Sequence, residues 1–574
     1  MSGASDPHDP GGPSITDDGG EGGEDSRHAF WADEVADRVE ARDPEDPIVI
    51  KGGVSPSGVP HIGHLNEILR GYFVAEALRE RGHEVRQVFT SDDRDPLRKV
   101  PRTLADLEWN VMDLGDTPNP GGLGRNLGKP LTDVPDPFGC CDSFGDHQTR
   151  LLDLMTEAVG VPVEVLSNTE LYEDGVFEDV TRELLADPEE ARALLAEFQD
   201  SVDAEGDYVP FTPVCESCGK LTGRVTGVDL DTGTVEYVCE DTEAGNRTIE
   251  GCGHEGSATL REGKLPWRFE WPAQWRVLGV DHEPFGKDHA EGSWPSGDRI
   301  ARDLLGDEPP VPMVYEWFTY NGEALSSSAG HVITVADVLE LVEVEVLRYF
   351  FTKPPKRARD FDVGRLDQLV DEFDRFEAVY FGEQTATDTE RARAERAYPM
   401  VVDGSATPGA VVRDGEPSPE RVRIPYTFAA VLGMTDDRSL RESMARRSGH
   451  IPETAPEWAV DAALERVPRA RAWAVRTDNE YNYRLAEELP DVEVDGREAA
   501  ALDALAAFVE SESPDGDALQ EAVYETARDH DVAVGEFFAL GYGLFLGQDE
   551  GPRLGPFLAA LDRTFVLRRL RREG

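Results

Sequence analysis

Residues 48–65 read IVIKGGVSPSGVPHIGHL, and this stretch decides the fold. The β-branched run at 48–50 predicts a buried strand, and the glycines and prolines after it predict a turn. Glycines that expose backbone N–H groups at a helix N-terminus form a site for phosphate. Beyond the turn a helix is predicted by apolar residues at helical spacing, namely Leu65, Ile68, Leu69, Tyr72, Phe73 and Leu78.

His61 and His64 stand where a phosphate-binding loop normally offers only backbone groups. Their imidazoles can donate hydrogen bonds to a polyphosphate during a reaction. The stretch is neither the G-x-x-x-x-G-K-[ST] loop nor the G-x-G-x-x-G fingerprint. The alternative is an ordinary turn between a strand and a helix, in which the histidines are incidental.

The chain has 574 residues and a formal net charge of −58, and only eight of its 57 basic residues are lysine. The length predicts two to four domains. Acidic residues spread along the whole chain indicate adaptation to a salt-loaded cytoplasm, where screening makes self-repulsion tolerable. Nucleic-acid-binding proteins normally carry the opposite charge. Phosphate contacts weaken steeply in salt, however, so the acidic total does not exclude RNA as a partner.

No apolar run has the length of a membrane span and no signal peptide opens the chain, so we expect a cytoplasmic protein without membrane contact. In that reducing setting clustered cysteines indicate metal rather than disulfides. Cys215, Cys218, Cys239 and Cys252 lie in a loop-rich segment, where tetrahedral structural zinc would supply the missing core. The alternatives are unliganded buried cysteines, or His254 in place of Cys252 as the fourth ligand.

A second group of soft ligands lies at residues 136–147, where Cys140, Cys141 and His147 fall within eight residues. Asp95 follows the predicted strand at 85–90, and carboxylates in such a position lie where doubly wound sheets bind ligands. Together these four residues make a mixed Cys/His/Asp set that can bind zinc. The alternative is a loop on the substrate side with reduced thiols.

Residues 61–64 read His-Ile-Gly-His, the signature of class I aminoacyl-tRNA synthetases and related nucleotidylyltransferases. The cysteine module and the segments 265–275, 283–289 and 314–334 make the chain resemble the class I lysyl-tRNA synthetases in particular. The resemblance implies an α/β fold, with a Rossmann-type parallel-sheet catalytic domain, a zinc-binding insertion and a C-terminal all-α domain that binds the anticodon. It also supports a metal cluster of the mixed layout described above.

The expected organisation follows from this resemblance and from composition. We expect a disordered acidic extension at 1–27, catalytic halves at 28–170 and 265–335, the insertion with its four-cysteine zinc module at 171–264, and the helical domain at 336–574. Further sheet strands are predicted at 163–167, near 277–280 and at 311–315.

The resemblance also places an amino-acid pocket, in which Trp267 and His289 pack on the aliphatic stem of lysine. Glu316 lies among aromatic residues, and an ammonium group needs both charge pairing in a dry pocket and cation–π contact. We therefore predict that Glu316 binds the ε-ammonium group, the alternative being a plain surface position. The predicted lysine-binding residues are Gly53, Ser55, Trp267, His289, Glu316 and Tyr320.

An ATP site is implied as well. The family has a mobile loop of the Lys-Met-Ser-Lys-Ser type, but both expected lysines are alanine here, Ala324 and Ala329. Either Mg²⁺, His331 or Lys287 supplies the missing charge, or adenylation is slow. The predicted ATP-binding residues are Pro56, Gly58, His61, Gly63, His64, Ser326, Ser327, Ser328 and Gly330, of which both histidines and the three serines are also the predicted catalytic residues.

The implied reaction has two steps. The carboxylate of L-lysine attacks the α-phosphorus of ATP, which binds with Mg²⁺, and pyrophosphate leaves; the lysyl adenylate then esterifies the 3′ end of a lysine-accepting tRNA. No protein nucleophile is needed, so catalysis rests on positioning and charge stabilisation. Two alternatives stay open: another class I synthetase with a different pocket, such as a glutamyl or cysteinyl enzyme, and a tRNA-binding relative that has lost adenylation.

Overall fold

The computed structural model describes residues 28–199, 202–244, 247–325, 331–402, 412–413, 416–418, 420–512 and 514–573. Its centre is a five-stranded sheet in the order β14-β13-β1-β2-β5, and every neighbouring pair is parallel. The predicted Rossmann-type α/β fold is confirmed. The five strands are β1 (Ile48–Val54), β2 (Val85–Ser91), β5 (Glu164–Ser167), β13 (Val280–Gly286) and β14 (Val311–Tyr315).

The direction of strand addition reverses at β1. The chain places β2 and then β5 on one side of β1, and it later returns to place β13 and β14 on the other side. In open α/β sheets a ligand crevice lies outside the carboxyl ends of the strands at such a reversal. The signature turn that follows β1 therefore lies where this fold binds substrates.

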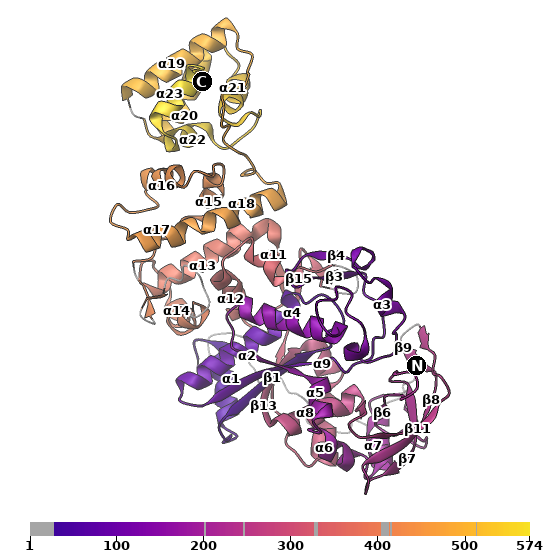
Figure 1. Ribbon diagram of the computed structural model, residues 1–574. Helices are drawn as coiled ribbons and strands as arrows, with labels where there is room; N and C mark the ends of the chain where they lie inside the picture. The colour runs from indigo at the N-terminus through magenta and orange to yellow at the C-terminus, as the bar shows by residue number, and fades with distance from the viewer. Residues whose placement is uncertain are drawn as a thin grey trace, which may run out of the picture.

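Side chains of β1 alternate between two hydrophobic cores. Ile48 and Ile50 belong to the cluster that contains α2 (Ile62–Glu80), whereas Val49 packs with tryptophans of α8 (Trp267–Leu278). Figure 1 shows α2 and α8 on opposite sides of β1. A strand covered on both faces reads as a continuous apolar run, which is why residues 48–50 lack polar alternation.

The second half of the sheet begins later than the sequence predicts. The pattern predicts a strand near 277–280, but α8 continues to Leu278 and β13 begins at Val280. Gly279 ends the helix in the left-handed conformation with φ 65°, which glycine adopts without a Cβ penalty. Residues 277–278 thus form the end of a buried helix, which periodicity alone does not distinguish from a short buried strand.

Between β5 and α8 the chain forms a module with its own antiparallel sheet, in the order β11-β8-β7, and the strand pair β12-β6. Its apolar side chains share a cluster with Phe269 and Ala273 of α8, so the module packs on the catalytic domain. Its elements are α5 (Asn168–Glu173), α6 (Glu178–Leu184), α7 (Pro188–Ala196), β6 (Thr212–Pro213), β7 (Gly223–Asp229), β8 (Thr234–Cys239), β9 (Thr242–Ala244), β10 (Arg247–Ile249), β11 (Glu255–Thr259) and β12 (Gly263–Lys264).

Shorter elements complete the region around the sheet. A loop excursion between β2 and β5 carries one small hairpin and leads into a long helix, and two short helices follow β13. These elements are α1 (Trp31–Glu40), β3 (Thr103–Ala105), β4 (Val111–Asp113), α3 (Gly121–Gly124), α4 (Phe144–Ala158), α9 (Lys287–Glu291) and α10 (Trp294–Arg299).

From α11 onward the chain is mostly helical and extends away from the sheet (Figure 1). The described residues of this region also contain short strands: β18 (Val412–Arg413) pairs with β19 (Glu416–Pro417), and β17 (Arg359–Phe361) pairs in parallel with β15 (Phe318–Tyr320), itself paired with β16 (Glu323–Ala324). One buried cluster continues from α2 through α12 to α23. The helices are α11 (Val335–Leu339), α12 (Val344–Thr352), α13 (Leu366–Tyr380), α14 (Asp388–Val401), α15 (Tyr426–Leu432), α16 (Arg438–Arg447), α17 (Glu457–Leu464), α18 (Arg466–Thr477), α19 (Gly496–Glu512), α20 (Gly516–Asp529), α21 (Val534–Leu546), α22 (Leu554–Ala560) and α23 (Arg563–Leu570).

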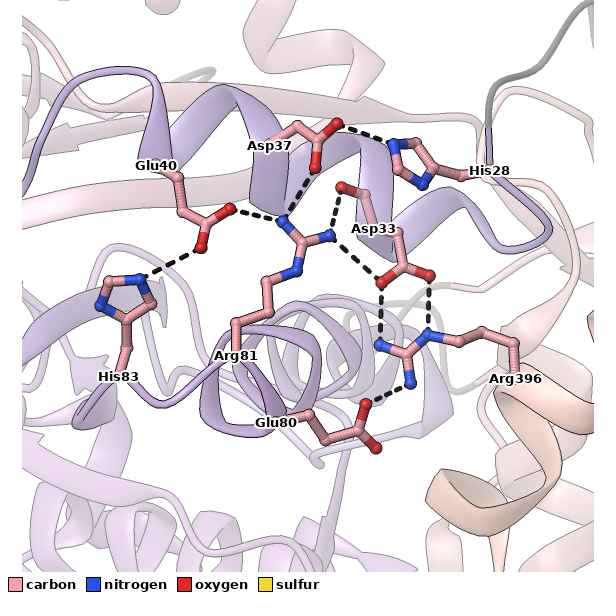
Figure 2. A network of polar contacts seen from close by, with 8 residues as sticks. All are labelled: His28, Asp33, Asp37, Glu40, Glu80, Arg81, His83 and Arg396. Atoms are coloured by element: carbon pink, nitrogen blue, oxygen red, sulfur yellow. Dashed lines mark hydrogen bonds and ion pairs between the residues drawn. The ribbon is translucent and has the colours of Figure 1, made fainter.

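A charged network ties α1 and α2 to α14 (Figure 2). Arg396 of α14 donates to both carboxylate oxygens of Asp33, at 2.8 Å each. Arg81, just past α2, donates to Asp33, Asp37 and Glu40. The Asp33–Arg396 contact joins residues 363 positions apart in the chain. A bidentate arginine–carboxylate pair fixes orientation as well as distance, so the network holds the helical region against the catalytic domain.

Candidate active site and metal centres

Two stacked imidazoles open α2 at the carboxyl end of β1, with ring centroids 4.1 Å apart. Nδ1 of His61 accepts the N–H of Gly63 at 3.0 Å, and the backbone N–H of His61 donates to Nδ1 of His64 at 3.3 Å. Burial lowers the pKa of His61 well below its usual range and that of His64 to about 4, so both rings are neutral at pH 7. Because Nδ1 is an acceptor in each ring, the proton lies on Nε2, and both rings offer a donor to a phosphate oxygen.

The turn that holds these rings has little free space. A Cβ on Gly63 would lie 2.5 Å from Cε1 of His61, so the stacked pair requires glycine at this position. Pro56 is buried and Gly58 is half-buried in the same turn. The other predicted ATP-binding residues, Ser326, Ser327, Ser328 and Gly330, lie outside the described residues.

Gly53 lies at the carboxyl end of β1, where the structure adds a carboxyl group that the sequence does not predict. The N–H of Gly53 donates to Oε1 of Glu67 at 2.7 Å, and the hydroxyl of Tyr315 donates to Oε2 at 2.9 Å. Burial raises the pKa of Glu67 to about 7. A Cβ on Gly53 would lie 2.2 Å from Oγ1 of Thr90, so no larger residue fits without displacing β2.

A wall of indole rings stands beside the carboxyl end of β13. Trp267 and Trp271 are stacked, and the ring of His289 lies 6.1 Å from the first and 5.5 Å from the second. The structure thus brings the rings of Trp267 and His289 together. Glu283 anchors this wall from β13, because it accepts from the indole N–H of Trp271 at 2.9 Å and from Nζ of Lys51 at 2.9 Å.

The predicted ammonium partner, Glu316, follows β14 directly. Its Oε1 accepts from Nζ of Lys287 at 2.9 Å, and both side chains are partly exposed. Lys287 begins the short helix that also carries His289, so Glu316 lies beside the end of the indole wall. Tyr320 lies further along, in β15, where its ring is 5.0 Å from that of His331 and its carbonyl accepts from His331 Nε2.

Three carboxyl groups surround one buried ammonium group past the end of β2. Nζ of Lys264 lies 2.5 Å from Asp95 and 2.8 Å from Glu270. Asp92 accepts from Nε2 of Gln274 at 3.0 Å, and burial raises its pKa to about 8. The predicted metal ligand Asp95 is therefore paired with Lys264 instead.

The four cysteines of the inserted module come together. Their sulfur atoms all lie within 4.8 Å of one another, with Cys215 3.6 Å from Cys252 and Cys218 3.7 Å from Cys239. His254 points to Glu216 instead, with Nε2 2.8 Å from the carboxylate. The alternative in which His254 replaces Cys252 is therefore not the arrangement found, and the four sulfurs make a group that could hold a metal ion.

A second group of potential ligands lies at the start of α4. Asp136, Cys140, Cys141 and His147 each offer an atom within 4.8 Å of the others. Nε2 of His147 bonds to the carbonyl of Ala105 at 2.9 Å, which leaves Nδ1, 3.3 Å from Cys140 Sγ, as the free acceptor. The carboxylate of this group is that of Asp136 and not, as predicted, that of Asp95. The sequence indicates Asp136 by its position four residues before Cys140.

The family follows from a match over most of this structure. A family profile described as "tRNA synthetases class I (K)" matches residues 29–401. The chain belongs to this family. The class I synthetase is 66% identical to the lysine–tRNA ligase of Natronomonas pharaonis, over 96% of this chain and 98% of that protein. It is 64% identical to the enzyme of Halobacterium salinarum over the same shares, and 31% identical to that of Pyrococcus horikoshii over 95% and 99%.

Membership makes the protein an ATP-dependent ligase of protein synthesis. The haloarchaeal source of the more similar relatives agrees with the salt-adapted composition of this synthetase. Within the described part of the chain, none of the synthetase's helices is long and apolar enough to cross a membrane.

Proposed function

We propose that the synthetase is a lysine–tRNA ligase, which activates L-lysine with ATP and Mg²⁺ and transfers it to the 3′ end of a lysine-accepting tRNA. The observation that carries this proposal is an identity of 64–66% to lysine–tRNA ligases over 96% of the chain. The geometry agrees, because the phosphate-type turn and the indole wall lie at the carboxyl edge of one parallel sheet.

His61 and His64 act on the triphosphate. Their Nε2–H groups donate to phosphate oxygens, and the stacked geometry fixes both donors before substrate arrives. Both rings are neutral, so they orient the α-phosphate and stabilise the transition state by hydrogen bonds rather than by charge. Mg²⁺, when bound with ATP, neutralises phosphate charge and makes pyrophosphate a better leaving group.

The amino-acid pocket lies between the ends of β1, β13 and β14. Gly53 and Ser55 receive the α-amino end, and Trp267 and His289 pack on the methylene chain, with Tyr320 further along the wall. Glu316 receives the ε-ammonium group in exchange for Lys287, whose Nζ is 2.9 Å away in this structure. The released Lys287 then faces the nucleotide.

That exchange compensates for the serine-rich loop, which lacks the two lysines typical of the family. Ser326, Ser327, Ser328 and Gly330 bind phosphates through hydroxyl and backbone N–H groups. The charge that the missing lysines would bring comes from Lys287 and Mg²⁺. In this arrangement lysine binding and charge neutralisation of pyrophosphate depend on the same glutamate.

Zinc fits the four cysteines of the insertion, Cys215, Cys218, Cys239 and Cys252. Zinc–sulfur bonds of about 2.3 Å in a tetrahedron place the sulfurs about 3.8 Å apart. The two shortest contacts described above, 3.6 and 3.7 Å, are close to that value. Zinc there would be structural, because it would tie the turn between β6 and β7, which carries Cys215 and Cys218, to the end of β8 and to the loop before β11.

The second group, Asp136, Cys140, Cys141 and His147, fits a mixed zinc site with three ligand types. Its histidine is already oriented by the carbonyl of Ala105, as metal-ligating histidines normally are. We assign this site to ordering the loop before α4. The enzyme works in the salt-rich cytoplasm of a halophile, where its acidic surface is screened.

The test is ATP–pyrophosphate exchange in concentrated KCl with each of the twenty amino acids. Exchange that depends on lysine alone supports the proposal. Exchange with glutamate or cysteine would instead identify another class I specificity. No exchange, together with retained binding of tRNA, would identify a relative that has lost adenylation.

A further inference from the structure

We infer that Lys264 is a positioning residue of the catalytic centre, supplied by the inserted cysteine module. It acts through the acidic loop of Asp92 and Asp95 on the end of β1, where Ser55 begins the turn to α2. The inference rests on the proposed function, since Ser55 is placed there at the amino-acid pocket. It goes further by assigning to the insertion a part in positioning the substrate-binding turn.

The first step is the burial of the ammonium group. The side chain of Lys264 is 5% exposed, and its partners Asp95 and Glu270 are 14% and 0% exposed. Its Nζ contacts both carboxylates, at 2.5 and 2.8 Å. The other base near Asp95 is Arg98, whose contact is 3.7 Å long and whose side chain is 59% exposed. Lys264 is therefore the dominant counter-charge of this carboxylate.

The second step leads from Asp95 to the active-site turn. The backbone N–H of Asp95 donates to the carbonyl of Asp92 at 3.0 Å, and the N–H of Asp92 donates to the carbonyl of Val54 at 2.9 Å. The acidic loop is therefore joined to the end of β1, directly before Ser55. A shift of Asp95 is thus transmitted to Val54 and to Ser55, the next residue.

The third step concerns the origin of Lys264. It ends β12, which pairs with β6, and Cys215 follows β6 by two residues. Arg94 of the acidic loop donates to the carbonyls of Gly263 and Arg261, at 2.8 and 2.5 Å. Hydrogen bonds to the backbone therefore join the module to the catalytic loop, in addition to the ion pairs. The position of the module thus determines where the ammonium group of Lys264 lies.

Removing the ammonium group would leave Asp92, Asp95 and Glu270 to repel one another in a buried site. Asp95 would move toward water or take up a proton, and the backbone bonded to it, up to Val54 and Ser55, would shift with it. A displacement of about 1 Å at a substrate-binding group is enough for a loss of about 100-fold. The loss should appear mainly in the KM for lysine, since the hydrogen bonds that hold the His61–His64 pair do not involve this cluster.

The experiment is lysine-dependent pyrophosphate exchange by the full-length enzyme and four variants, namely K264M, K99M, S55A and K264M/S55A. We expect K264M to raise the KM for lysine about 10- to 100-fold. The matched control is K99M, which removes an exposed lysine of the same loop region and should leave the KM unchanged. In an S55A background, K264M should cost much less than it does in the wild type, because the two residues act in series.

An unchanged KM in folded K264M, or costs of K264M and S55A that simply multiply, would overturn the inference. Should K264M fail to fold, the double variant K264M/E270Q removes one charge of each sign and carries the same expectation. Wild-type enzyme that exchanges without lysine would overturn the proposed function as well. Wild-type lysine exchange with an unchanged K264M overturns this inference alone.

Discussion

Replacing Glu283 with glutamine would leave the ammonium group of Lys51 buried without its counter-charge. The two groups are 2.9 Å apart, with side chains 1% exposed for Lys51 and 3% for Glu283. Breaking such a pair costs about 3–5 kcal/mol, because the remaining charge stays where it is poorly solvated. Glutamine also keeps one acceptor for two indole donors, which adds about 1 kcal/mol. We expect E283Q to lower the free energy of unfolding of the catalytic domain by about 4–6 kcal/mol.

The reverse variant separates the ion pair from the indole bonds. K51M should cost about 3–5 kcal/mol, since Glu283 then carries the unpaired charge. The double variant K51M/E283Q buries no net charge and should cost only about 1–2 kcal/mol. The coupling energy that follows from these costs is about 5 kcal/mol or more. Arg86 and Glu164 form a matched control at 2.7 Å with side chains 40% and 51% exposed, for which the coupling should stay below about 1 kcal/mol.

Urea unfolding followed by tryptophan fluorescence measures both cycles, at low and at high KCl. Salt should reduce the coupling of the exposed pair and leave that of the buried pair unchanged, because counterions do not reach it. Costs of K51M and E283Q that add within about 0.5 kcal/mol would refute the reasoning. So would a coupling between them that disappears in salt.

Three further outcomes are expected. Since burial lowers the pKa of His64 to about 4, below about 6.5 in the unfolded chain, the unfolded state binds more protons between these values. The contribution of His64 to the free energy of unfolding should therefore be fully present above pH 6.5 and fall by about 3 kcal/mol toward pH 4. H64N should lack this pH dependence, which urea titrations at successive pH values measure. G53A should abolish exchange by its contact with Oγ1 of Thr90, and G53A/T90A should recover part of it; no recovery would show that the contact is not the cause. C218S should lower the zinc content measured by atomic absorption and expose the module to protease, whereas C218S with full zinc content would exclude Cys218 as a ligand.

Sequence reasoning succeeds here where the signal is local. The run at 48–50, the turn and the helix after His61 are consecutive, so propensity, periodicity and turn chemistry point to one structure. The four cysteines are likewise informative by identity, because soft ligands in a short segment have few other uses in a reducing compartment. In both cases the chemistry does not depend on distant residues.

The polar groups beneath the pocket are a different case. Glu283 meets Lys51 across 232 residues, and Lys264 meets Asp95 across 169. From the sequence alone each of these residues would be assigned to the solvent-exposed surface, since charged residues are rarely buried. Glu283 and Lys51 meet because β13 and β1 are neighbours in the sheet, whereas Lys264 meets Asp95 because the inserted module packs against the loop after β2. The position of Glu67 is partly predictable from the sequence, because its spacing of three residues from His64 places it on the same side of α2.

The charge balance of the carboxyl edge bears on which amino acid it accepts. Burial raises the pKa of Asp92 to about 8 and that of Glu67 to about 7, so both carboxyl groups hold a proton for much of the time at pH 7. A cationic side chain that binds nearby would favour their charged forms by attraction, whereas those forms would repel the carboxylate of glutamate. The same residues therefore disfavour a glutamyl specificity before any pocket contact is considered. The five carboxyl groups are Glu67, Asp92, Asp95, Glu270 and Glu283, and the two ammonium groups are Lys51 and Lys264.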